Sequence, residues 1–332
     1  MMILLCRGFF AYTIIFLQIN FLRHMTMSYR SGLNTGSMRW LLVVFLLAFA
    51  PSVKAEYFTY MTNNAAVTIL GYTGSGSAVN IPETVNGFPV TSIGDSAFTA
   101  CTNVVSITIS SNVCSIGAAA FDGCTSLVNV KIPDTVTNIG DHAFSYCTSI
   151  NKISIPRSVV SIGLLPFEGC CTLTAISVDA LNLVYSSADG VLFNRGQSKL
   201  IQFPQGKMGG YKIPKSVIGI ADHAFLRCNG LSSIMIGNNV ASIGDESFFA
   251  CSSLSNVIIS SGVDRIGRMA FAFCTNLSSI TVDVFNPEYN SVDGILYNKT
   301  RTSLIQYPGG KAGHFKVPDS VTNIENGALP FP

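Results

Sequence analysis

A repeat of 23 residues runs through most of this chain and restricts its fold more than any other feature. The pair Ile93-Gly94 recurs at this interval through Ile162 and, after a gap, the isoleucine resumes at Ile220 and again every 23 residues; a phenylalanine follows five residues after each isoleucine and a cysteine three residues further on. Seven units keep this register, and their cysteines are Cys101, Cys124, Cys147, Cys170, Cys228, Cys251 and Cys274. One unit is too small to bury its own apolar side, so the units must stack and share an elongated core. The repeat therefore predicts a solenoid.

Each unit contains the pattern of one short strand. Segments such as Ile107-Thr108-Ile109 alternate apolar and polar residues, which buries one face and leaves the other in water. The Ala-Phe-x-x-Cys segment has helical spacing, enough for about one turn. We therefore predict a mainly β solenoid with short helical turns and about ten parallel-strand rungs. The last apolar residues of these rungs are Ile81, Ile109, Ile132, Ile155, Val178, Ile213, Ile236, Ile259, Val282 and Val317.

Two coils are 35 residues long instead of 23 and carry a duplicated sequence. Residues 178–217 and 282–321 are identical at 20 of 40 aligned positions. Both contain two alternating runs joined by five residues, which predicts a β-hairpin that projects from the stack. The hairpin aromatics, which we expect to cover the coils beneath, are Phe193, Phe203, Tyr297 and Tyr307.

The first 55 residues differ from the rest of the chain. They hold five basic residues and no acidic one, whereas the remainder has 15 basic and 18 acidic residues. Residues 38–55 combine a basic start, an apolar stretch and a small-residue cleavage site at Ala55, which predicts a signal peptide. Residues 1–37 are then an over-extended N-terminus or the first membrane segment of an anchor. Either alternative places the rest of the chain in a non-cytosolic compartment.

Two further segments complete the predicted organisation. Residues 56–80 contain two apolar runs around Asn63-Asn64, which predicts a capping hairpin for the open end of the stack. Residues 81–332 form the solenoid. Its last unit stops at Leu329, before the position of its cysteine, and no polar capping segment follows. A solenoid normally needs such a cap, so we expect the solenoid to be truncated at its C-terminal end.

The composition excludes several classes of protein. The mean hydropathy of +0.43 would suit a polytopic membrane protein. However, no apolar run after residue 55 approaches the ~20 residues of a membrane-spanning helix, so membrane contact is expected only through the N-terminal segment. A net charge of +2 with 11% charged residues gives no basic footprint for nucleic acid.

The unit L-x-x-I-x-I-P-x-x-V-x-x-I-G-x-x-A-F-x-x-C resembles the BspA-type leucine-rich repeats of bacterial surface proteins. The segments 92–98 and 137–144 are typical of that pattern, and the resemblance covers roughly residues 80–328. It implies a leucine-rich-repeat solenoid that is secreted or held at the bacterial cell surface or envelope. Members of the family include adhesins, so an extracellular protein or glycan is the implied partner. The resemblance implies no catalytic residue.

The cysteines and histidines do not form a reactive constellation. The chain has no C-x-x-C pair, which argues against a zinc knuckle or a redox motif. The in-register cysteines are interpreted mainly as buried thiols, with a ladder of disulfides as the alternative. Cys114 lies off the ladder and Cys171 is expected to point away from the core. His142 and His223 share a variable repeat position, which indicates surface residues. No enzyme activity, metal or cofactor is predicted.

A binding surface is the remaining functional hypothesis. The outward strand positions are mostly small and polar, but Met235 and Ile258 are adjacent apolar exceptions. With Lys131 and Lys212 at equivalent outward positions, they are the predicted ligand contacts. The sequence thus favours a non-catalytic secreted or cell-surface module that binds a protein or glycan. The alternative is a structural cell-envelope protein that self-associates.

Overall fold

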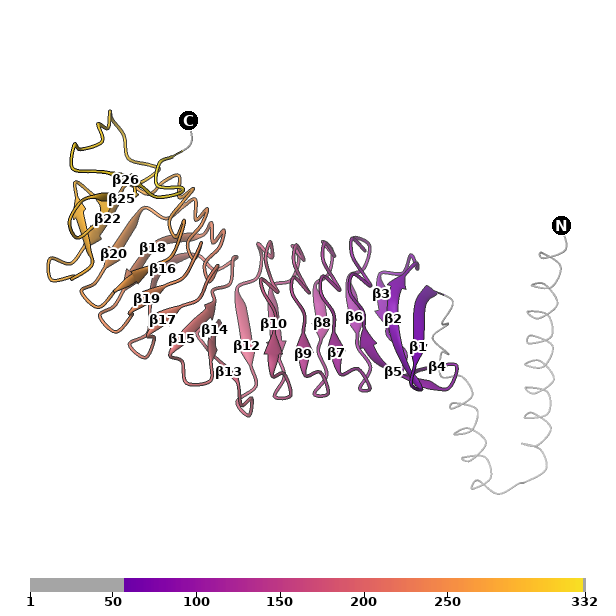
Figure 1. Cartoon of the computed structure of the whole chain (residues 1–332). Coiled ribbons are helices and arrows are strands. Elements are labelled where there is room, and N and C mark those ends of the chain that lie inside the picture. The colour runs from indigo at the N-terminus through magenta and orange to yellow at the C-terminus, as the bar shows by residue number, and fades with distance from the viewer. Residues whose placement is uncertain (1–56, 331–332) are drawn as a thin grey trace, which may run out of the picture. The chain divides into compact units, whose positions relative to one another are not determined.

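The structure, a computed structural model, describes residues 57–330 and confirms the predicted solenoid. The signal peptide with Ala55 and the segment 1–37 lie outside the described residues. Between residues 57 and 330 the regular elements are 26 strands, and no helix there has the length and apolar character needed to cross a membrane. The coils follow one another along the stack in chain order (Figure 1).

Each regular coil contributes one rung strand to one side of the solenoid. Most of these strands pair in parallel at a 23-residue offset, as Ile153 does with Ile176, because the units repeat the same apolar alternation; the first pair, which spans the longer first coil, has an offset of 28. They form three separate sheets. The rung strands are β3 (Ala78–Asn80), β6 (Ser106–Thr108) and β8 (Asn129–Lys131), then β10 (Lys152–Ile155) and β12 (Ala175–Val178), then β16 (Gly209–Lys212), β18 (Leu231–Ile236), β20 (Asn256–Ile259) and β22 (Ser279–Val282).

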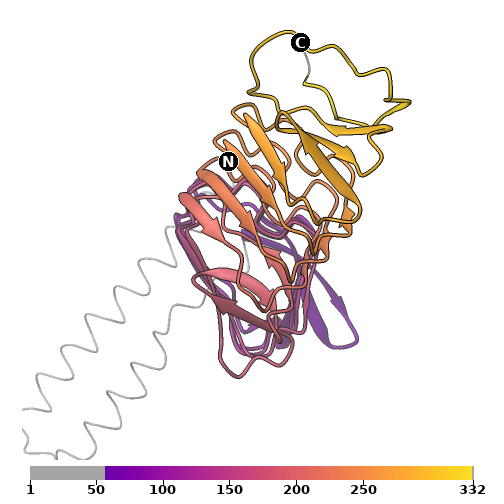
Figure 2. The same cartoon turned by 90° about the vertical axis from the view of Figure 1, so that its left-hand side faces the viewer.

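A return strand on the other side of each coil ends at the repeated isoleucine, which glycine follows in most coils. Most return strands have only two residues, and they pair in parallel from coil to coil in runs that are interrupted at each long coil. Seen after a 90° turn, successive coils lie one behind the next (Figure 2). The return strands are β5 (Phe88–Ile93), β7 (Ser115–Ile116), β9 (Asn138–Ile139), β11 (Ser161–Ile162), β17 (Gly219–Ile220), β19 (Ser242–Ile243), β21 (Arg265–Ile266) and β26 (Asn323–Ile324).

The Ala-Phe-x-x-Cys segment forms consecutive turns, so the predicted short helical turns are not present. Residues such as Ala119 and Gly123 have positive φ (50° and 70°), which interrupts any helix. The N–H of Asp122 bonds to Ala119 within its own turn, whereas the N–H of Phe121 bonds to Ala143 of the next coil. A helical turn would use both donors within the segment. The N–H groups instead bond alternately within the segment and to the next coil, which joins neighbouring coils along a third side of the solenoid.

Rings and thiols fill the core in register. Phe98, Phe121, Phe144 and Phe167 stack with centroid separations of 5.1, 5.1 and 5.9 Å. A second stack runs through Phe203, Phe225, Phe248 and Phe271. The nine described cysteines are free thiols; six of the seven ladder cysteines are buried as predicted, Cys101 is part-exposed, and Cys114 and Cys171 are exposed as expected.

In each long coil the predicted hairpin is inserted into the stack and does not project. Strands β13 (Tyr185–Ala188), β14 (Val191–Asn194) and β15 (Lys199–Gln202) form an antiparallel meander, and β15 pairs in parallel with β17. The second long coil repeats this with β23 (Tyr289–Val292), β24 (Ile295–Asn298) and β25 (Ser303–Gln306), which pairs with β26. The hairpin aromatics are buried, as predicted.

The middle strand of each meander separates two parts of the core. On β14, Leu192 belongs to the N-terminal apolar cluster, whereas Val191 and Phe193 belong to the next one, and all three are fully buried. Strand β24 divides the second cluster from a third in the same way. We call β14 and β24 the septum strands.

A buried asparagine shapes the start of each long coil. Asn182 is fully buried, and its Nδ2 donates to the carbonyls of Pro156 and Val159 at 2.8 and 2.9 Å. Its Oδ1 accepts two backbone N–H groups at 2.9 and 2.7 Å. Asn286 makes the same four bonds 104 residues later.

The two ends of the described stack differ from its middle. An antiparallel hairpin of β1 (Phe58–Asn63) and β2 (Ala66–Tyr72) precedes the first coils, and β2 pairs in parallel with β5. Strand β4 (Thr84–Val85) adds a short antiparallel pair with β5. The rung predicted to end at Val317 is not a strand. Its counterpart β16 pairs with β18, but no later rung strand is available to Val317 within the described residues.

Candidate binding surface

The second large rung sheet carries a strip of residues with mixed chemistry. Strands β16, β18, β20 and β22 align Lys212, Met235, Ile258 and Thr281 as direct neighbours in a parallel register. All four side chains are exposed, and Met235 and Ile258 have 47% and 46% of their surface in contact with solvent. An apolar pair is therefore presented on a sheet face between an ammonium group and a hydroxyl group. We call these four residues the outward strip.

The neighbouring outward row of the same sheet is small and polar. Gly210, Ser233, Asn256 and Ser279 occupy it in register. None of these side chains is large enough to cover the outward strip, so the two apolar side chains stand clear of the row beside them. The sheet face can consequently contact a ligand over several coils.

A groove of about 320 Å³ continues the outward strip at the end of β16 and β18. Lys212 and Met235 line it from the sheet, and Lys215, Asn238 and Asn239 line it from the loops that follow the strands. The Asn239 Nδ2 donates to the Lys215 carbonyl at 2.6 Å, which holds the two loops together. The groove thus combines an apolar wall with two ammonium groups and amide groups. That set suits a ligand with an apolar part and acidic or hydroxyl oxygens.

The predicted contacts do not all lie together. Lys131 is exposed on β8, where it pairs with Thr108 in the N-terminal rung sheet. Lys212, Met235 and Ile258 form one strip, and Lys131 belongs to a different sheet. Sequence reasoning missed Lys215, Asn238 and Asn239, because they lie in loops whose approach depends on the stacking of two coils. The proline that ends the rung, Pro214, was the available signal for those loops.

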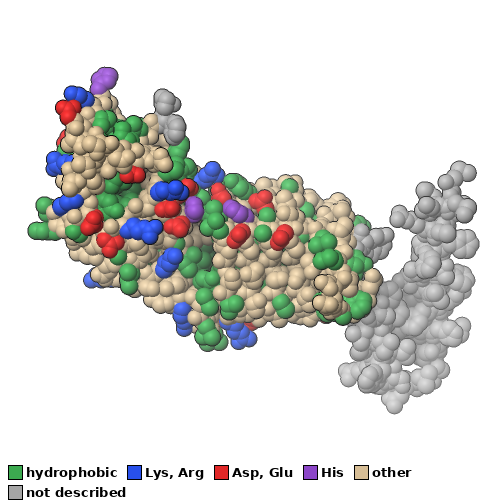
Figure 3. All heavy atoms as spheres, viewed as in Figure 1, with side chains coloured by type: hydrophobic (Ala, Val, Ile, Leu, Met, Phe, Trp, Pro, Cys, Tyr) green, Lys and Arg blue, Asp and Glu red, His purple; other side chains and the backbone are tan. Residues whose placement is uncertain are grey.

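A network of charged side chains joins coils across the first long coil. Glu168 is largely buried, and its carboxylate lies 3.6 Å from both His142 Nδ1 and an Arg227 guanidinium nitrogen. The Arg227 guanidinium also donates to the Tyr146 hydroxyl at 3.2 Å. Charged side chains gather over this middle part of the solenoid in Figure 3. His142 has 40% of its side chain exposed, as expected for a surface position, and lies beside the Glu168 carboxylate.

Residues 57–330 contain no candidate metal centre. No group of three or more histidine, cysteine or acidic side chains is arranged there to hold a metal ion. The buried thiols are also poorly suited to nucleophilic chemistry, because burial raises the pKa of Cys124 and of Cys170 to about 12.

Comparison with known proteins places the fold. A model of the "BspA type leucine rich repeat region" matches residues 72–188 and 202–329 in six copies. A leucine-rich repeat protein from Eubacterium ventriosum has a similar solved structure, with a TM-score of 0.56, 23% identity and 81% of each chain covered. This likeness shows the fold alone. A search of curated proteins finds no match.

Two further solved structures are similar at lower scores. The pneumococcal vaccine antigen PcpA has a TM-score of 0.48 and 18% identity, covering 81% of this chain and 92% of its own. A leucine-rich cell surface protein from Faecalibacterium prausnitzii has a TM-score of 0.42 and 23% identity, covering 83% and 97%. The repeat model matches well over half of the sequence. The chain belongs to the BspA-type leucine-rich repeat family.

Proposed function

We propose that this protein is a non-catalytic, secreted or cell-surface protein of a bacterium that binds an extracellular protein or glycan through the outward strip. The observation that carries this proposal is the in-register pair Met235 and Ile258, each nearly half exposed on the sheet face next to Lys212 and a groove. Exposed apolar side chains framed by polar ones are typical of contact surfaces. Secretion is supported by the predicted signal peptide of residues 38–55.

The proposal is tested by binding of the purified full chain to arrays of glycans and extracellular matrix proteins. A ligand found there is titrated by surface plasmon resonance against Met235→Lys/Ile258→Lys. The matched control is Ser154→Lys/Ser177→Lys, which adds two lysines at paired outward positions of the β10–β12 sheet. We expect at least a tenfold weaker affinity for the first variant and an unchanged affinity for the control. Equal losses in both variants, or no saturable binding at all, would contradict the proposal.

A second candidate function is structural self-assembly, and one observation favours it. The loops that open the two long coils expose large apolar side chains at their tips, with Leu183 82% and Phe285 83% exposed. The buried Asn182 and Asn286 beside them fix both loops. Sedimentation velocity over a range of concentrations tests this function. Assembly without any ligand that is lost in Leu183→Asp/Phe285→Asp would support it, and a monomer at all concentrations would exclude it.

A further inference from the structure

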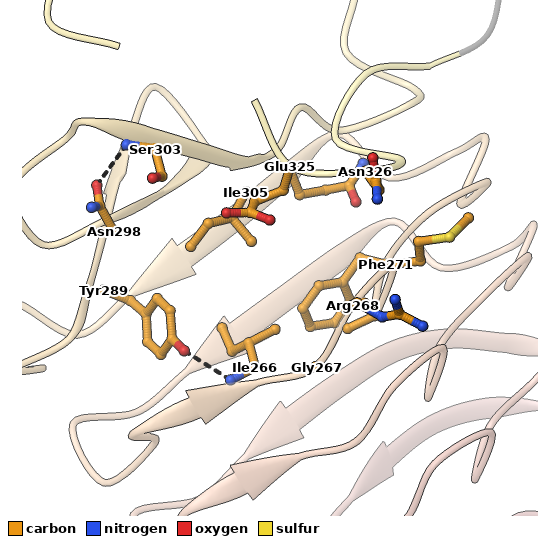
Figure 4. A pocket seen from close by; sticks show the side chains of 13 residues that line it. Ile266, Gly267, Arg268, Phe271, Tyr289, Asn298, Ser303, Ile305, Glu325 and Asn326 are labelled. Atoms are coloured by element: carbon orange, nitrogen blue, oxygen red, sulfur yellow. Dashed lines mark hydrogen bonds between the residues drawn. The ribbon is translucent and has the colours of Figure 1, made fainter. Parts of the chain in front are cut away.

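At the second long coil, a cavity of about 280 Å³ lies between the coil of β21 and the coil of β26. We call this place the second junction, the corresponding place at the first long coil the first junction, and the cavity the junction cavity. The phenylalanine stack ends there, since Phe271 packs on Phe248 at 5.3 Å with one side and lines the cavity with the other. Figure 4 shows Ile266, Arg268 and Phe271 on one wall and Glu325 and Asn326 on the opposite wall. The cavity therefore has an apolar floor and charged groups of opposite sign on its two walls.

These charged groups have capacity left for a ligand. The only ion pair of Arg268 within residues 57–330 joins its Nε to Asp245 at 3.8 Å, and 80% of the arginine side chain is exposed. Glu325 accepts from the Asn323 amide at 2.7 Å through Oε1, which leaves Oε2 without a donor in the described chain. Arg268 and Glu325 do not pair with each other.

Tyr289 adds a donor at the side of the cavity. Its hydroxyl oxygen accepts the N–H of Ile266 at 2.8 Å (Figure 4), so the hydroxyl proton remains available. Burial raises the pKa of Tyr289 and keeps this proton in place at neutral pH. The cavity thus offers a cation, an anion and a neutral hydrogen-bond donor around an aromatic floor.

A long coil can form without these charged residues, because the first long coil lacks them. The frame of the cavity is the same 104 residues earlier, where Phe167 and Tyr185 correspond to Phe271 and Tyr289. The charged positions differ, because Leu164 stands in place of Arg268 and Ala221 in place of Glu325. That junction is instead bridged by Arg227 and Glu168. Two opposite charges that do not pair with each other are therefore found at the second junction and not at the first.

We propose that this junction cavity binds a small zwitterion, namely a free α-amino acid with an apolar or aromatic side chain. The carboxylate would pair with Arg268, the ammonium with Glu325, and the side chain would lie against Phe271. A volume of about 280 Å³ suits one such molecule and is below the range of pockets that hold drug-sized ligands. Bidentate pairing of a guanidinium with a carboxylate gives the orientation.

Isothermal titration calorimetry of the full chain with leucine and phenylalanine tests this site. Three probes separate the contacts: the N-acetyl amino acid lacks the ammonium, the amino acid amide lacks the carboxylate, and glucose tests for a neutral sugar. We expect saturable binding of the free amino acids and at least tenfold weaker binding of both derivatives. Absence of binding at millimolar concentrations, or preferential binding of glucose, would overturn the proposal.

Variants locate the binding in this cavity. Arg268→Ala and Glu325→Ala are each expected to weaken binding at least tenfold, while the matched control Arg265→Ala, which does not line the cavity, leaves it unchanged. Far-UV circular dichroism checks that each variant is folded. Amino acid binding that persists in both cavity variants would assign it to another place and overturn the proposal.

Discussion

The thiol of Cys147 donates to the backbone carbonyl of Phe121 in the preceding coil, with a sulfur–oxygen distance of 3.2 Å. Cys124, Cys170, Cys251 and Cys274 make the equivalent bond at 3.0–3.1 Å. The cysteine ladder therefore contributes hydrogen bonds between coils as well as apolar volume. A disulfide between neighbours would consume the protons that these bonds require.

Replacement of one ladder thiol is expected to cost stability. Cys147→Ala leaves a small cavity and removes one hydrogen bond, so we expect the free energy of unfolding to fall by about 1–2 kcal/mol. Urea unfolding followed by circular dichroism measures the change. Cys171→Ala is the control, since Cys171 is exposed and its replacement should change stability by less than about 0.5 kcal/mol. Equal effects in the two variants would show that the ladder has no special role.

The reactivity of the cysteines should divide into two groups. The thiolate is the reactive form, and burial raises the pKa of Cys124 and Cys170 to about 12, so little thiolate forms at pH 8. We expect Ellman's reagent to modify Cys114 and Cys171 quickly in the folded chain and the six buried ladder thiols only after unfolding, with the part-exposed Cys101 between these two groups. Mass spectrometry of labelled peptides identifies the modified residues. Rapid labelling of Cys124 without denaturant would contradict the buried ladder.

Alkaline pH should destabilise the protein through the same groups. The folded pKa of Cys124 and of Cys170 lies above the unfolded value of 9.0, so folding holds their protons more tightly. Their contribution is complete below pH 9 and is lost as the pH rises from about 9 to about 12, by up to about 1.4 kcal/mol per pH unit and group. Urea midpoints between pH 8 and pH 11 measure this loss, and Cys124→Ala should show a shallower decline. An equally steep decline in that variant would contradict the assignment.

The buried asparagine of the first long coil should be essential for stability. Asn182→Ala leaves two carbonyls and two N–H groups without their partner, and we expect a loss of about 3 kcal/mol or more. Asn151→Ala is the control, because Asn151 is exposed. Urea unfolding of both variants tests the expectation. A loss below about 1 kcal/mol for Asn182→Ala would show that water replaces the side chain easily.

The repeat predicted much of the core because its period fixes which residues point inward. The register of Met235 with Ile258 followed directly from the 23-residue spacing. The turns were mistaken for helix, because Ala-Phe-x-x-Cys has the same spacing in a helical turn and in two consecutive turns. What distinguishes them is the positive φ of residues such as Ala119, which the one-dimensional pattern does not reveal.

The insertion of the hairpins and the junction cavity could not be predicted from the sequence. The hairpins were recognised, but their insertion depends on the pairing of β15 with β17, a contact between residues about twenty positions apart. The junction cavity joins Arg268 to Glu325 across 57 residues without a shared motif. Only the three-dimensional stacking of the coils brings such positions to one site.

The septum strands have a consequence for how the molecule comes apart. In a linear stack, disruption passes from each coil to its neighbour through their shared core. At the first long coil the two cores meet through the alternating faces of the meander: Leu192 and Ile201 pack with the N-terminal cluster, whereas Phe193 and Leu200 pack with the next one, so fewer apolar contacts cross here than between regular coils. Unfolding of the coils that follow β14 can then stop at this strand and leave the coils before it folded. Native-state hydrogen exchange would resolve the two parts as separate cooperative units. Damage at one end of the solenoid is thereby confined.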